Sequence, residues 1–79
     1  MSIASAYAAL ARSNIHVNHI EYSQDGDPLA IEVGFQLRFT PQLTKIMHIV
    51  VPYDYPNLEE NLERVREEVK HIRQYAEVF

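Results

Sequence analysis

Residues 57–79 read NLEENLERVREEVKHIRQYAEVF, and their apolar side chains recur at alternating steps of four and three. Such spacing predicts an α-helix with one narrow apolar stripe. Asn57, followed three residues later by Glu60, predicts a capping box that opens this helix. The stripe must pack against the rest of the chain or against a second copy. Its members, which we call the heptad seam, are Leu58, Leu62, Val65, Val69, Ile72, Ala76 and Phe79.

The run LAIEVGFQLRF, residues 29–39, offers a surface for the seam. Its apolar side chains alternate with polar or small ones, which is typical of a strand with one buried face. Pairing the seam with a second copy would leave that face bare, at a cost of about 25 cal/mol per Å². We therefore expect the seam to pack on the chain's own sheet. The expected buried face is Leu29, Ile31, Val33, Phe35, Leu37 and Phe39, and the exposed face includes Glu32, Gln36 and Arg38.

Two further strands are expected beside this one. IHVNHIEY, residues 15–22, is rich in β-branched and aromatic residues, and IMHIVVPY, residues 46–53, is stopped by Pro52. Between the first two strands, Asp25-Gly26 predicts a type I′ turn, in which both residues need a positive φ. The resulting register pairs Tyr22 with Leu29 and Ile20 with Ile31, and brings Val17 near Gly34.

The first strand changes phase, because Ile15 and Val17 are odd-numbered whereas Ile20 and Tyr22 are even-numbered. A β-bulge at Asn18-His19 would bring all four side chains onto the core face. For the third strand, a five-residue loop through Lys45 is expected. This loop would pair Phe39 with Met47 and Leu37 with Ile49, and would add Met47, Ile49, Val51 and Tyr53 to the core.

The Ala-rich residues 2–13 predict a first helix, with Ile3, Tyr7 and Leu10 on one face and a stop at Asn14 in the left-handed conformation. The element order is then α-β-β-β-α. We predict a single α+β domain over residues 1–79, a three-stranded antiparallel meander with both helices packed on one face. A domain this small needs dense packing, oligomerisation or both, since the chain has no cysteine.

Composition restricts the classes of partner. Seven basic against eleven acidic residues give a net charge of −4, which argues against direct binding of nucleic acid or of anionic membranes. No apolar run reaches the length of a membrane span. The start, MSIASAYAALARSN, lacks the basic first region of a signal peptide, so a cytoplasmic location is expected by default.

Few residues point to chemistry. His16 and His19 form an HxxH pattern, but on a regular strand they face opposite sides, and only a bulge would realign them. No cysteines or carboxylates stand at zinc-ligand spacing, and two glycines cannot build a phosphate-binding loop. We expect no catalytic residues, no metal and no cofactor. A ligand-binding or metal-binding domain that uses His16, His19 or Tyr22 stays open as an alternative.

The α-β-β-β-α order at this length resembles the double-stranded-RNA-binding domain over the whole chain, in topology alone. That family places a lysine-rich loop and helix start against phosphates, where this chain has Glu59, Glu60 and Glu63. Phosphate contact at that position would be repulsive. The chain is therefore not assigned to that family.

Three features predict binding to proteins. The first helix carries no charge through Ala11, and the third strand carries no charge from Ile46 to Val51. Uncharged strand edges are normally covered or paired, so we expect a homodimer. The helix that bears the heptad seam has an acidic flank. The expected dimer residues are Ile46, His48, Val50, Ala4, Ala8 and Ala11, and the expected partner-binding residues are Glu59, Glu60, Glu63, Glu67 and Glu68.

The sequence thus predicts a small acidic protein-interaction module that is not an enzyme. Adaptors, subunits and compact inhibitors of larger host proteins have this profile, including those carried by phages and mobile elements. A structural subunit that assembles only with itself is the alternative.

Overall fold

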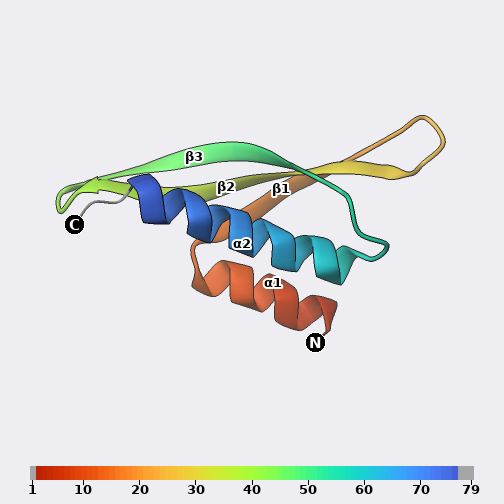
Figure 1. Ribbon diagram of the computed structural model, residues 1–79, viewed down its shortest axis with the longest axis horizontal. Helices are drawn as coiled ribbons and strands as arrows, with labels where there is room; N and C mark the ends of the chain where they lie inside the picture. Colours follow the sequence, from red (N-terminus) through yellow and green to blue (C-terminus); the bar gives the residue numbers. More distant parts are fainter. Residues whose placement is uncertain (1, 77–79) are drawn as a thin grey trace.

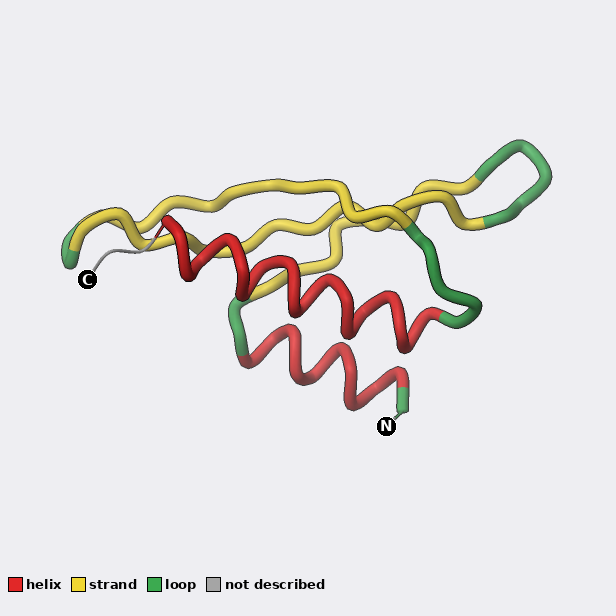
Figure 2. The backbone as a smooth tube through the Cα atoms, viewed as in Figure 1, coloured by secondary structure: helices red, strands yellow, loops and turns green. Residues whose placement is uncertain are grey.

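The computed structural model describes residues 2–76 and has the predicted element order. Helix α1 (Ile3–Arg12) precedes strands β1 (Ile15–Tyr22), β2 (Pro28–Thr40) and β3 (Leu43–Pro52), and helix α2 (Leu58–Ala76) follows them. The strands form one antiparallel sheet in the order β1-β2-β3. Both helices lie on the same side of this sheet (Figures 1 and 2). The predicted α+β architecture is confirmed.

The heptad seam packs on the chain's own sheet, as predicted. Leu62, Val65 and Val69 are buried, while Leu58, Ile72 and Ala76 are partly buried against the same cluster. Phe79 lies outside the described residues. The surface that the seam covers comes mainly from alternate residues of β2, namely Ile31, Val33, Phe35 and Leu37, with Val51 of β3 and Ile15 of β1.

The predicted core is too long at both ends. Leu29 and Phe39 are 55% and 39% exposed, and Met47 is 39% exposed. The 19 residues of α2 extend about 29 Å, whereas the 13 residues of β2 extend about 43 Å. The sheet therefore projects beyond the helix at each end (Figure 1), and Leu29 and Phe39 stay exposed there. Met47 is exposed for another reason, because it pairs with the buried Phe35 but lies on the edge strand β3.

The first hairpin differs from the predicted type I′ turn. Gly26 has a φ of 87°, but Asp25 does not have a positive φ. The Gly26 N–H donates to the Ser23 carbonyl (3.0 Å), and the Ser23 N–H donates to the Asp27 carbonyl (2.8 Å). A loop that ends in one left-handed glycine is one residue longer than a type I′ turn. Tyr22 consequently pairs with Pro28 rather than Leu29, while the predicted pair Ile20–Ile31 is confirmed.

The second hairpin is tighter than predicted. Thr40 pairs with Leu43, so two residues make the turn in place of a five-residue loop through Lys45. The Thr40 Oγ1 accepts the N–H groups of Gln42 (3.3 Å) and Leu43 (3.0 Å), and this closes the turn. The predicted pairs Phe39–Met47 and Leu37–Ile49 are wrong. The observed pairs are Phe35–Met47 and Leu37–Lys45.

The predicted β-bulge in β1 is present. The register shifts between Val17 and His19, so Asn18 is the extra residue. His16 pairs with Gly34, and Val17 pairs with Val33, one residue away from the expected position. The bulge turns Ile15, Val17 and Ile20 toward the core, but Tyr22 is 58% exposed, so the prediction for that fourth side chain is wrong.

Helix α1 ends as predicted, with Asn14 in the left-handed conformation at a φ of 57°. Its buried face differs from the expected one, because Ala6, Ala9 and Leu10 are buried whereas Ile3 and Tyr7 are largely exposed. Helix α1 packs against α2 and β1. Small alanine side chains allow this close approach, and that explains why they replace the larger residues at the contact.

Arg73 of α2 ties the helices to the sheet. Its Nη1 donates to the Ser13 carbonyl at the end of α1 (2.7 Å), and its Nε and Nη2 donate to the Gln36 carbonyl of β2 (3.0 and 2.7 Å). The guanidinium carbon lies 5.7 Å from the ring centre of Phe35. One side chain thus satisfies carbonyls from two other elements.

Leu37→Ala tests the core, and Leu29→Ala tests where the core ends along β2. Removing the buried Leu37 side chain should lower the free energy of unfolding by about 2–5 kcal/mol, because it leaves a cavity under α2. Leu29→Ala should cost less than about 1 kcal/mol, since that side chain is largely exposed. Urea unfolding followed by circular dichroism measures both, and equal losses would contradict this boundary of the core.

Candidate functional site

His16 and His19 of β1 lie on the outer face of the sheet, the face without helices. The β-bulge realigns His16 and His19, which pair with Gly34 and Glu32 and so share one face. His19 Nδ1 lies 2.7 Å from Glu32 Oε2, and its Nε2 lies 3.7 Å from Glu21 Oε1. Among residues 2–76, no group of three histidines or carboxylates is arranged to hold a metal ion.

His48 of β3 lies over Gly34 on the same outer face. Its ring atoms would be 3.2 Å from a Cβ at position 34, closer than ordinary contact. Asn18, the extra residue of the bulge, has its Nδ2 3.2 Å from His48 Nδ1. The missing side chain of Gly34 and the Asn18 amide therefore hold the His48 ring toward β1 and away from the free side of β3.

Four of the five predicted partner-binding glutamates line one open groove on α2. Glu59, Glu60, Glu63 and Glu67 form it together with Tyr55, Asn57 and Arg64. Glu68 lies outside this acidic groove, with its Oε1 3.9 Å from Arg64 Nε. The predicted capping box is present in altered form, because the Glu60 N–H donates to Asn57 Oδ1 (2.9 Å) while the Asn57 amide donates to the Glu60 carboxylate (3.2 Å).

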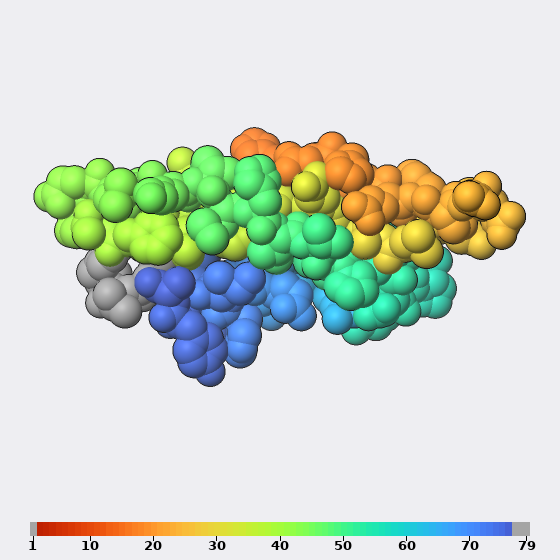
Figure 3. Space-filling view, turned by 90° about the horizontal axis from the view of Figure 1, so that it is seen from above, coloured from red at the N-terminus to blue at the C-terminus, as the bar shows by residue number. Residues whose placement is uncertain are grey.

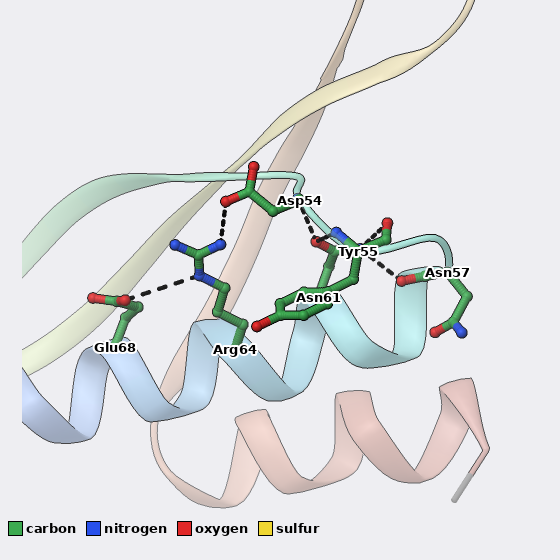
Figure 4. A network of polar contacts seen from close by, with 6 residues as sticks. All are labelled: Asp54, Tyr55, Asn57, Asn61, Arg64 and Glu68. Carbon is green, nitrogen blue, oxygen red and sulfur yellow. Dashed lines mark hydrogen bonds and ion pairs between the residues drawn. The ribbon is translucent and has the colours of Figure 1, made fainter.

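Arg64 lines the acidic groove, and Figure 4 shows its guanidinium group between the carboxylates of Asp54 and Glu68. It pairs with Asp54, and this hydrogen bond raises the pKa of Arg64 above its ordinary value. The guanidinium carbon also lies 5.9 Å from the ring centre of Tyr55. The groove therefore keeps an acidic character in spite of the arginine, with an aromatic ring beside the carboxylates. Carboxylates next to a tyrosine ring suit a cationic side chain.

Asn61 holds the loop that carries Tyr55. Its side chain is 1% exposed, and its Oδ1 accepts the N–H groups of Asp54 (3.0 Å) and Tyr55 (3.2 Å). Its Nδ2 donates to the carbonyls of Tyr55 (3.0 Å) and Asn57 (2.6 Å). All the donors and acceptors of this buried amide are used, so it fixes the loop against the start of α2.

A second open groove lies beside the later turns of α2. Arg66, Lys70 and Arg73 line it together with Glu67 and Gln74, beside Ser13 after α1 and Ile15 at the start of β1. The sequence reasoning missed the roles of Arg73 and Asn61. Residue type gives a weak signal for Asn61, a polar residue beside Leu62 of the seam, but gives none for Arg73, whose acceptors are backbone carbonyls distant in sequence.

The predicted dimer residues fall on two separate surfaces. Ile46 and Val50 are 55% and 56% exposed, and they lie with His48 along the rim of the sheet. Figure 3 looks down on β3 and shows it uncovered by other described elements. Ala4, Ala8 and Ala11 are exposed residues of α1, and this helix lies across α2 from β3 (Figure 1). The two surfaces are not continuous.

Comparison with protein-family models, with curated proteins and with solved structures finds no match to this chain. Between residues 2 and 76, no helix has both the length and the apolar character needed to cross a membrane.

Asn61→Asp should destabilise the fold although it changes one atom. The carboxylate would place an oxygen against the carbonyls of Tyr55 and Asn57 where the amide donated, at a cost of about 2 kcal/mol or more. Gln74→Glu is the matched control, because it makes the same chemical change on the exposed face of α2. Chemical denaturation compares the two, and a loss no larger than that of the control would show that Asn61 does not hold the loop.

Proposed function

We propose that this chain is a non-enzymatic protein-interaction module that binds an extended strand along β3. The observation that carries the proposal is the β3 edge, defined as the free side of residues 43–52. It is unpaired in the described chain, and the apolar side chains of Leu43, Ile46, Met47 and Val50 are exposed on β3. Strands of this kind recruit a further strand through their backbone groups, and specificity comes from alternate side chains.

Residue parity identifies the backbone groups that are available on the β3 edge. The Tyr53 N–H donates to the Leu29 carbonyl of β2 (2.9 Å), and the register runs without a shift from Pro52 to Thr44. In an antiparallel sheet, alternate residues bond to opposite neighbours. The odd-numbered residues therefore bond to β2, and the backbone groups of Thr44, Ile46, His48 and Val50 point outward.

Pro52 ends the β3 edge. Pro52 occupies the next even-numbered position after Val50. At that position, the backbone N–H of any other residue would point away from β2. Since proline has no N–H, the row of free donors stops at Val50. The binding surface is therefore short, from Thr44 to Val50. Its outward-facing residues include the two apolar side chains most exposed on β3, Ile46 and Val50.

The acidic groove is a second candidate surface, and it favours a partner with lysine or arginine side chains. The specific observation is that Glu59, Glu60, Glu63 and Glu67 converge with Tyr55 while Asp54 neutralises Arg64. This partner would be a basic surface of a larger protein. No residue of β3 lines the acidic groove, so the groove and the β3 edge are separate surfaces. One partner therefore need not exclude the other.

Capture from a lysate of the source organism, with paired baits, tests binding at the β3 edge. The wild-type chain should retain proteins that a Val50→Lys bait loses, because a lysine at the edge would be buried without a partner charge. Gln36→Lys is the control bait, since it adds the same charge on the exposed outer face of the central strand. Proteins retained equally by all three baits would contradict binding at this edge.

Charge reversal tests the acidic groove. A short peptide rich in lysine and arginine should shift the backbone amide resonances of Tyr55, Glu63 and Glu67, and the shifts should shrink as salt is added. Glu63→Lys combined with Glu67→Lys should abolish them, whereas Glu68→Lys, outside the groove, should leave most of the response. Equal effects of the two variants would indicate general attraction to an acidic protein rather than a groove.

A further inference from the structure

We infer that the strand bound at the β3 edge is β3 of a second copy, paired antiparallel about a two-fold axis that passes beside His48. This inference rests on the proposed function and deepens it by naming the partner. The resulting dimer would have a continuous six-stranded sheet. In it, His48 lies opposite His48 of the second copy, and Ile46 lies opposite Val50 of the second copy.

The geometry of a sheet limits the choice of register. A two-fold axis perpendicular to the sheet keeps each side chain on its own face, so outer-face residues pair only with outer-face residues. The outward-pointing backbone groups belong to the even-numbered residues Thr44, Ile46, His48 and Val50. Their N–H and C=O groups can pair reciprocally when His48 lies at the axis, and Pro52 then falls at the periphery, opposite Thr44.

Side-chain matching selects this register over the neighbouring one. With His48 at the axis, the two most exposed apolar side chains of β3, Ile46 and Val50, cover one another on the outer face. On the helix side, Met47 meets Ile49 of the second copy. With Met47 at the axis, Val50 would lie opposite Thr44, and Lys45 would lie opposite Ile49. That register sets polar residues against apolar ones on both faces.

The position of the His48 ring makes the axis accessible. A bulky ring on a strand edge would obstruct its own symmetry mate, but this ring is folded over Gly34 and lies 3.2 Å from the Asn18 amide. The glycine, the bulge residue and the histidine come from three different strands. Together they keep the His48 side chain over β2 and β1, so that it does not block a second strand approaching the centre of the β3 edge.

The helices leave the approach open. Helix α2 packs against β2 and α1, and α1 packs against α2 and β1. Strand β3 forms the upper rim of the sheet in Figure 1 and lies uncovered in Figure 3. Pairing two such rims would cover Ile46, Met47 and Val50, which are otherwise exposed. An interface of one strand pair is small, so the dimer is expected to dissociate in the micromolar range or above.

Sedimentation equilibrium from about 1 µM to about 1 mM tests the dimer. The wild-type chain should pass from monomer toward dimer over this range. Val50→Lys should weaken self-association by about tenfold or more, because each copy would bury a lysine against Ile46 of the other. Gln36→Lys, on the central strand, should associate like the wild type. A wild-type chain that stays monomeric at all concentrations, or a dimer that survives Val50→Lys, overturns the inference.

Single cysteines test the register, because the natural chain has none. His48→Cys should oxidise readily to a disulfide-linked dimer, since residues opposite one another in an antiparallel pair have Cα atoms about 5.5 Å apart. Met47→Cys should cross-link far more slowly, because its symmetry mate would be displaced by two residues along the strand. Preferential cross-linking through position 47 overturns the proposed register.

The two proposals fail in different ways. A strictly monomeric chain whose capture of other proteins still depends on Val50 would overturn the dimer and leave the interaction module in place. Capture that is indifferent to Val50, combined with a wild-type chain that does not associate, would remove both.

Discussion

The apolar face of β2 is the constraint on which the rest of this structure depends. Ile31, Val33, Phe35 and Leu37 must all be covered, and the heptad seam of α2 covers them. The seam is narrow, so α2 lies along the centre of the sheet and shelters β3 only in part. Helix α1 then packs beside α2, toward β1. The open rim at β3 follows from this arrangement, because the two helices of the described residues pack mainly on β1, β2 and one another, and Val51 is the one fully buried residue of β3.

Two polar side chains complete what apolar burial cannot. Arg73 closes the end of α2 onto carbonyls of Ser13 and Gln36, and Asn61 closes its start onto the loop after β3. Each satisfies backbone groups that would otherwise compete for water at the margin of a small core. In the described residues, every buried polar side-chain atom has a hydrogen-bond partner. Both ends of α2 are therefore held against the rest of the chain, and the surfaces that α2 carries keep a defined geometry.

The sequence was sufficient for those features that depend on local pattern. The seam spacing placed α2, the change of phase in β1 placed the bulge at Asn18, and Asn14 marked the end of α1. The hairpin registers were not predictable in the same way, because a single hydrogen bond from a turn residue such as Thr40 shifts the whole pairing. The limits of the core were also missed. Whether a leucine in β2 is buried depends on the length of α2 relative to the strand, and periodicity contains no such information.

Of the candidate surfaces, the sequence identified the residues but not their grouping. The glutamates of α2 were visible as a charged flank, yet only the fold separates Glu68 from the others and sets Tyr55 beside them. The positions of the two surfaces have a joint consequence. A two-fold axis perpendicular to the sheet leaves both copies of α2 on the same face, so pairing at the β3 edge would present two acidic grooves toward one side. Two weak sites held at a fixed separation bind a repeated basic surface more tightly than one site does, without any additional contact. In such an assembly, the short edge of β3 would set the spacing, and α2 would supply the acidic charge.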